Sequence, residues 1–186
     1  HKLLDTAYLC VRLKYDTDQF AQGLPNISTV VRCKKVYNPV SATTAWSQNP
    51  ALCVFDYLKD TKYGLAESAS NVNSTALIAA QSLCDETVNL SGGGSQQRYV
   101  LDGVLDTANS RKDNIEAMLS SMGGKLIYSG GEYFIVGAEY NTPTITVDES
   151  VLVGGISVKT KQRSRSLYNG VKGVYLAEEE NYTLAD

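Results

Sequence analysis

The chain has 186 residues, of which 43% are hydrophobic and 20% are charged, and its formal net charge is −3. This hydrophobic content is sufficient for a packed core, which excludes a wholly disordered chain. The small net charge predicts no general affinity for nucleic acid or anionic membranes. No apolar run approaches the roughly 20 residues that cross a bilayer, and the first residues show no signal-peptide pattern.

Two strands are predicted in residues 1–45, which we expect to form a β-hairpin region. Residues 6–15 and 27–37 alternate in side-chain polarity, as strands with two different faces do. The polar residues 16–26 lie between them as a long loop, and Asn38-Pro39 ends the second strand.

Residues 46–123 are predicted to form a mainly helical subdomain with one strand, 97–106. Each expected helix follows a capping residue and repeats apolar side chains at helical spacing. Asn49-Pro50 is a helix start because Asn caps well and Pro suits the first helical position. The three helices are expected near 50–60, after Asn73 or Ser74 over 74–86, and after Ser110 over 111–122.

Residues 124–186 are predicted to form an antiparallel β region. Ser129-Gly130-Gly131 separates two apolar runs, 125–128 and 132–138, which is a hairpin signal because Gly supplies positive φ. Further strands are expected at 144–147, 156–162 and 168–176. With the helices between strand-rich regions, the predicted fold class is α+β with mostly antiparallel pairing.

The cysteines and the single histidine indicate no catalytic or metal site. Cys10, Cys33, Cys53 and Cys84 contain no C-x-x-C spacing, so no zinc site is expected. We expect four reduced thiols, and a Cys10–Cys33 disulfide stays possible. His1 is the only histidine and it is terminal, which argues against Ser-His-Asp and Cys-His catalysis. No cofactor motif is found, and the glycine-rich loop 91–95 lacks the lysine of a phosphate-binding loop.

Two groups of charged residues are candidates for a functional role. Asp102 and Asp106 lie on one face of the expected strand and, with Glu116, are the candidate carboxylates of a glycosidase-like hydrolase. Lys159, Lys161, Arg163 and Arg165 alternate at a period of two, so an extended backbone places all four on one side. This basic stripe is either a solvated sheet face or an interface with an acidic protein surface.

One segment resembles a known family. Trp46, Asn49, Pro50, Asp56, Tyr63 and Gly64 match the pattern W-x-x-N-P-A-x-x-x-x-D-x-L-x-x-x-x-Y-G of the central tail-tip hub proteins of long-tailed phages. That family includes the lambda-type host-attachment proteins and their prophage relatives. Weaker matches follow in the same order at Cys84-Asp85, Arg98-Tyr99, Asp102-Gly103, 114–122, 131–135 and Tyr168-Asn169-Gly170. The resemblance covers about residues 1–177.

The resemblance implies a structural role and an expected architecture. Such hubs are homotrimers that close the tail tube and carry host-recognition parts, so this chain resembles an internal module of a longer protein. It implies an antiparallel, barrel-like β layer with a three-helix insertion or neighbouring subdomain, made in the bacterial cytoplasm and located in the virion tail tip. The expected partners are further copies and other tail proteins, with no sequence-specific nucleic acid and no membrane insertion. The alternatives are a cell-wall hydrolase using Asp102 and Glu116, and a stand-alone carbohydrate- or protein-binding module.

Overall fold

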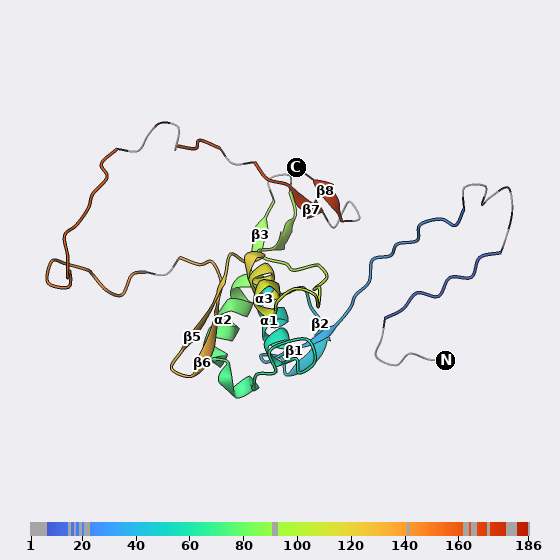
Figure 1. Cartoon of the computed structure of the whole chain (residues 1–186), viewed down its shortest axis with the longest axis horizontal. Helices are drawn as coiled ribbons and strands as arrows, with labels where there is room; N and C mark the ends of the chain where they lie inside the picture. Colours follow the sequence, from blue (N-terminus) through green and yellow to red (C-terminus); the bar gives the residue numbers. More distant parts are fainter. Residues whose placement is uncertain are drawn as a thin grey trace. The chain divides into compact units, whose positions relative to one another are not determined.

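Helices, hairpins and long extended segments alternate along the chain in the computed structural model (Figure 1). The structure describes residues 7–14, 16, 18, 20, 23–90, 93–140, 142–161, 164, 167–170, 172–177 and 182–185. The chain divides into two units, one of residues 1–9 and 32–141 and one of residues 10–31 and 142–186. Each unit is described by itself below.

The helices of the first unit begin where their capping residues predict. They are α1 (Pro50–Lys59), α2 (Ser74–Asp85) and α3 (Arg111–Ser120), and a short 3-10 helix, η1 (Ala69–Asn71), precedes α2. The side chains of Asn49, Asn73 and Ser110 accept hydrogen bonds from backbone N–H groups of the first turn of their helices. These contacts confirm the three predicted helices, with α3 ending two residues earlier than expected.

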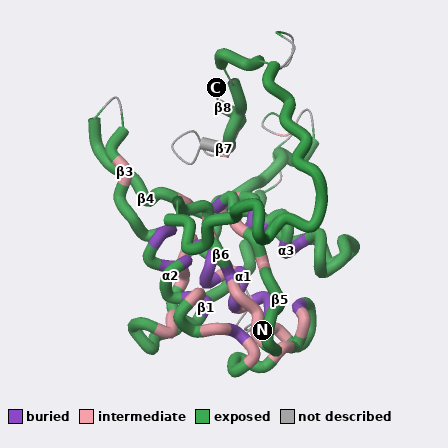
Figure 2. The backbone as a smooth tube through the Cα atoms, turned by 90° about the vertical axis from the view of Figure 1, so that its left-hand side faces the viewer, coloured by how far each residue is buried: buried purple, intermediate pink, exposed green. Residues whose placement is uncertain are grey.

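The core of the first unit lies between the three helices and one hairpin strand (Figure 2). Val54, Leu58 and Cys84 are completely inaccessible to solvent, and Leu77 and Met118 are 2% exposed. Strand β6 (Glu132–Val136) adds Ile135, which is 1% exposed, against α1 and α2. One strand face and three helix faces therefore share a single hydrophobic cluster.

All described strands pair as two-stranded antiparallel sheets, so the fold is mixed α+β as predicted. No closed barrel is present within the described ranges. The pairs are β1 (Lys35–Asn38) with β2 (Thr43–Trp46), β3 (Thr87–Asn89) with β4 (Ser95–Gln97), β5 (Lys125–Ser129) with β6, and β7 (Tyr175–Ala177) with β8 (Thr183–Ala185).

The predicted hairpin around Gly130 is confirmed. β5 and β6 pair from Lys125 opposite Val136 to Ser129 opposite Glu132. Gly130 and Gly131 form the turn with φ of +61° and +89°, values that residues with a Cβ rarely adopt. The other side of β6 is also occupied, because Asn73 donates its backbone N–H to the Tyr133 carbonyl at 2.9 Å.

Several predicted strands are wrong for the residues that the structure describes. Residues 7–14, 144–147 and 156–161 have no strand, and within 27–37 only the end, from Lys35, is a strand. The strand predicted over 168–176 is present only at its end, where β7 begins at Tyr175. Residues 6, 15, 162 and 171 lie outside the described residues. Alternating polarity indicates which face of a strand is apolar, but a strand also needs a neighbouring strand to pair with, and pairing is not encoded in the alternation.

The strand predicted over 97–106 is also wrong, because strand β4 ends at Gln97. The following residues are bound to the helices instead of to another strand. Arg98 donates its backbone N–H to the Glu86 carbonyl, and Tyr99 donates to the Cys84 carbonyl. Leu101 donates to the Gln48 carbonyl at 2.8 Å. The backbone donors that a sheet would use are therefore satisfied at the C-terminus of α2 and before α1.

Candidate functional site

Asn49 joins two helices through a buried hydrogen-bond network. It is 3% exposed, and its Oδ1 accepts from the backbone N–H groups of Ala51 and Leu52 at 3.0 and 3.3 Å. Its Nδ2 donates to the Gln81 carbonyl and to Asp85 Oδ1 at 3.0 and 2.9 Å. Only an amide supplies both the acceptor that caps α1 and the donors that reach the end of α2. The Asn-Pro-Ala motif thus has a structural purpose.

Gly64 is fixed by a close backbone approach after α1. A Cβ at this position would lie 1.8 Å from the Tyr57 carbonyl oxygen and 2.9 Å from the Asp60 carbonyl oxygen. Asp60 shapes the same turn, since its Oδ1 accepts from the N–H groups of Lys62 and Tyr63. Tyr63 itself is 51% exposed, with Lys62 Nζ 4.8 Å from the centre of its ring. The Tyr-Gly pair therefore closes α1.

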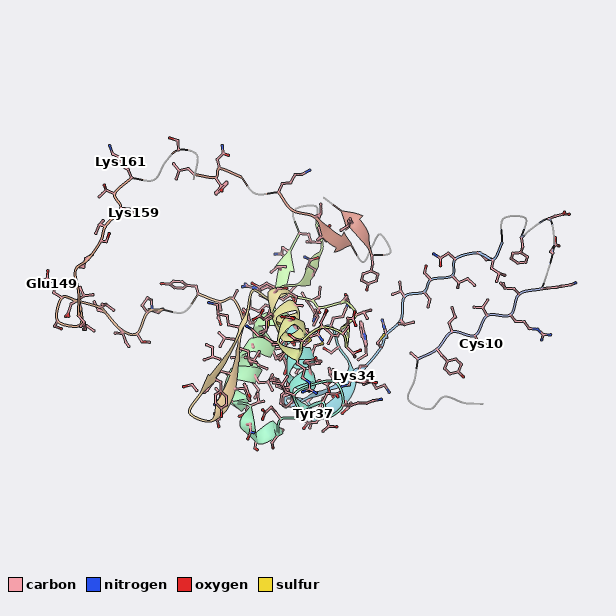
Figure 3. The ribbon with its side chains drawn as sticks, viewed as in Figure 1. Cys10, Lys34, Tyr37, Glu149, Lys159 and Lys161 are labelled. Atoms are coloured by element: carbon pink, nitrogen blue, oxygen red, sulfur yellow. The ribbon has the colours of Figure 1, made fainter. Side chains whose placement is uncertain are left out.

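Lys34 binds two carboxylates of α1 and of its C-terminal end at once. Its Nζ lies 2.6 Å from both Asp56 Oδ2 and Asp60 Oδ2, at the point where the chain enters β1 (Figure 3). Burial alone lowers the pKa of Lys34, but the hydrogen bonds that Lys34 donates to Asp56 and Asp60 outweigh it and raise that pKa. The hydrogen bond from Lys34 lowers the pKa of Asp60 well below its ordinary value. Sequence reasoning missed this ion pair because its members are 22 and 26 residues apart.

Trp46 and Phe55 differ in burial, and only Phe55 belongs to the core cluster. Trp46 is half-buried at the end of β2, and the Arg32 guanidinium carbon lies 4.6 Å from the centre of its ring. Phe55 is 5% exposed on α1, with Lys59 Nζ 4.4 Å from its ring centre. One of these cation–π contacts therefore involves α1, and the other involves the hairpin of β1 and β2.

Asp102 and Glu116, the candidate hydrolase carboxylates, each have a polar partner. Asp102 Oδ2 accepts from Gln48 Nε2 at 2.7 Å, which adds to the backbone bond between Leu101 and Gln48. Glu116 Oε1 lies 3.5 Å from Lys112 Nζ, one helical turn away on α3. Asp106 contributes its carbonyl to Asn114 and its carboxylate to the Ala108 N–H. These contacts hold the segment between β4 and α3 in place.

The cysteine side chains have contrasting environments. Cys84 is buried in the core and Cys53 is half-buried on α1, and burial raises the pKa of each thiol to about 11. Cys10 and Cys33 are exposed, and Cys10 projects from an extended segment (Figure 3). A raised pKa keeps a thiol protonated, which makes the two thiols of the packed unit poor nucleophiles at neutral pH.

The basic stripe is described only in part. Lys159 and Lys161 are exposed on a segment without secondary structure (Figure 3). Arg163 and Arg165 lie outside the described residues. Asn169, in the last of the family motifs, is exposed in an irregular segment.

The extended segments expose many apolar side chains. Ile145 is 77% exposed, Ile156 is 68% exposed, and Val153 is fully exposed. Leu24 and Val30, before β1, are 77% and 62% exposed. Exposed apolar side chains in such number are unusual on the surface of a monomeric soluble protein.

The described ranges contain no group of three or more His, Cys, Asp or Glu side chains able to hold a metal ion. None of their helices combines the length and apolar character that a bilayer-spanning segment needs.

The known proteins that are similar to this chain include two phage tail proteins, and no family model matches it. The chain is 24% identical over 189 residues to tip attachment protein J of Escherichia phage SECphi27, covering 92% of this chain and 16% of that protein. It is 27% identical over 192 residues to baseplate hub protein pb3 of Escherichia phage T5, covering 92% of this chain and 20% of that protein. The resemblance to phage tail-tip hub proteins is thereby confirmed. The chain spans about a sixth to a fifth of the length of these relatives.

Proposed function

We propose that this chain is a structural module of the central hub at a phage tail tip. The observation that carries this proposal is the similarity to a tip attachment protein and to a baseplate hub protein, each over 92% of the chain. The hydrogen bonds of Asn49 and the close approach at Gly64 support it, because they give the family motif a purely structural explanation.

In the proposed hub, three copies join around the tail axis and contact other tail proteins. Residues 1–45 and 124–186 supply antiparallel β segments to a barrel-like layer, and residues 46–123 supply the three-helix subdomain. The exposed apolar side chains of residues 24–31 and 142–158 support this arrangement. At residues 144–147 they alternate with threonines, as in a strand with two different faces, and burial in a shared layer would remove them from water.

The proposed location is the virion tail tip, after synthesis in the cytoplasm of the host bacterium. Antibodies against this chain should label the tail end of purified virions of the encoding phage in immunogold electron microscopy. Antibodies against the capsid protein serve as the control and should label heads. Label on heads, or no label on intact virions together with absence of the chain from their mass spectra, would contradict the proposal.

We also propose that the module has no enzymatic activity. Asp102 and Glu116 are held by Gln48 and Lys112, and a structural purpose accounts for both contacts. The purified chain should therefore not clear a peptidoglycan suspension. Clearing that is lost in both Asp102→Asn and Glu116→Gln would establish the hydrolase instead.

The basic stripe is proposed as an interface with an acidic neighbour in the hub. Such charge contacts determine partner choice more than affinity, and added salt weakens them. Reversing Lys161 and Arg163 to Glu in the full-length protein should lower trimer content and tail assembly. Unchanged assembly would make the stripe a solvated face.

A further inference from the structure

An open groove of about 820 Å³ lies between α3 and the start of β5. Its floor is apolar and consists of Leu65, Ile115, Leu119 and Leu126. Ile115 and Leu119 are 5% and 4% exposed and belong to the core, so the floor is rigidly packed. An added side chain could rest on this floor without disturbing the helices.

The groove borders the unpaired edge of a strand. β5 pairs with β6 through residues 125–129, and no other described strand pairs with it. The opposite edge of the hairpin is occupied by the contact between Asn73 and Tyr133. An unpaired edge presents backbone N–H and C=O groups to any extended segment that approaches it.

The rim of the groove is positively charged. Arg111, Lys112 and Lys125 line it together with one acid, Glu116. Glu116 is paired with Lys112 at 3.5 Å, whereas neither Arg111 nor Lys125 forms an ion pair with the described residues. An occupant that combines apolar and acidic residues therefore fits this groove best.

One exposed segment of this chain has that chemistry. Residues 142–153 contain Asp148 and Glu149 and no basic residue, and Glu149 is exposed in the turn that follows Asp148 (Figure 3). The other extended segments, 7–14, 23–34 and 156–161, all carry Lys or Arg and would be repelled by the rim. Ile145 and Val147 are 77% and 65% exposed, so this segment also has apolar side chains to bury.

We propose that residues 144–148 of a second copy of this chain pair with the open edge of β5. The five residues run antiparallel to Lys125–Ser129, which places Asp148 opposite Lys125. Val147 then lies opposite Leu126 and points into the groove, whereas a slip of one residue would turn it to the other face. The turn that begins at Asp148, closed by its carbonyl and the Val151 N–H, ends the new strand.

The length of the connection assigns the segment to a second copy. A strand that runs antiparallel to β5 runs parallel to β6, because β5 and β6 are themselves antiparallel. Within one chain, only residues 137–143 would connect β6 to this new strand. Parallel strands in one sheet need a crossover of about a dozen residues or more. The segment of a neighbouring copy has no such restriction.

This inference deepens the proposed function by naming a contact between copies in the hub. Binding between purified chains tests the contact itself, whereas immunogold labelling of virions tests the location. The contact between copies and the location in the virion can therefore be contradicted independently of each other.

Binding of a labelled peptide to the full chain tests the recognition. A fluorescein-labelled peptide of residues 142–153 should bind saturably, and Lys125→Glu should weaken binding by about five- to tenfold, the range of one or two surface ion-pair energies. A peptide that carries Asp148→Lys should bind the Lys125→Glu chain and so restore the lost affinity. Lys62→Glu, at an exposed cation outside the groove, is the matched control and should leave binding unchanged. Absent binding, equal binding by Lys125→Glu, or no rescue by the reversed peptide would overturn the proposal.

Disulfide cross-linking tests which copy supplies the strand. Ile127 and Thr146 are opposite each other in the proposed register and both are exposed. With Cys10 and Cys33 changed to Ser, a mixture of Ile127→Cys and Thr146→Cys chains should give a mixed disulfide dimer on mild oxidation. Placing the second cysteine at Ile156 instead of Thr146 should give none. A chain that carries both Ile127→Cys and Thr146→Cys serves as the counter-test. If it forms only an intramolecular disulfide when dilute, the strand comes from the same chain.

Discussion

Ile135 and Ile145 lie ten residues apart, yet the first is 1% exposed and the second is 77% exposed. The same contrast separates residues 32–140 from the extended segments before and after them (Figure 2). Both regions contain many β-branched and apolar residues. Among the described residues, the helices with capping residues and their shared hydrophobic cluster belong to the first region, whereas the second has one short strand pair, β7 with β8. Apolar content therefore does not make a core unless local structure brings apolar faces together.

Removal of one core side chain gives the largest test of this contrast. Leu58 is completely buried in α1, so Leu58→Ala should lower the free energy of unfolding by about 2–5 kcal/mol. Leu24→Ala makes the same change at a side chain that is 77% exposed, and we expect an effect within about 0.5 kcal/mol. Urea denaturation followed by circular dichroism measures both. Equal losses would show that residues 23–31 pack in the isolated chain.

A methyl group at Gly64 should cost about 1–3 kcal/mol, because the Cβ would overlap the Tyr57 carbonyl oxygen. Gly103→Ala is the matched control, since no atom lies within 4 Å of the Cβ position there. The melting temperatures of the two variants measure the difference. If Gly64→Ala melts at the parent temperature, the turn after α1 is not held as described.

A substitution at Asn49 distinguishes the capping of α1 from the hydrogen bonds to α2. Asn49→Asp keeps the acceptor for Ala51 and Leu52 but sets a carboxylate against Asp85, so we expect a loss of about 1–2 kcal/mol. Ser110→Asp, at the exposed cap of α3, should be nearly neutral because an acid suits a helix N-terminus. Chemical denaturation at pH 7 makes the comparison. A neutral Asn49→Asp would show that only the cap matters.

Lys34→Met should have the smallest effect, at most about 1 kcal/mol, because the Lys34 side chain is 58% exposed. The folded-state pKa of Asp60 is lowered, so the stabilisation is complete above the ordinary carboxyl pKa of 3.8 and is lost as the pH falls below it. The stability difference between parent and variant should therefore be present at pH 7 and shrink below pH 3.8. Lys125→Met, at an exposed lysine that forms no ion pair with the described residues, is the control. A difference that stays constant down to pH 2 would exclude the ion pair as its source.

Local signals in the sequence predicted the helices and one hairpin, because Asn49, Asn73, Ser110 and Gly130 act on their immediate neighbours. The strands at 7–14 and 144–147 were predicted wrongly for the isolated chain, because pairing depends on a partner that a local pattern does not contain. The structural purpose of Asn49 and Gly64 was indicated by the family motif. The Lys34 ion pairs and the groove beside β5 were not predictable, since they join residues far apart in sequence.

The buried amide of Asn49 has a consequence for how the molecule opens. Its four hydrogen bonds connect the first turn of α1 to the last turn of α2, so neither helix end can fray alone without stranding a buried polar group. In a hydrogen-exchange experiment, the amide protons of these two helix ends should therefore exchange together, with one shared free energy of opening.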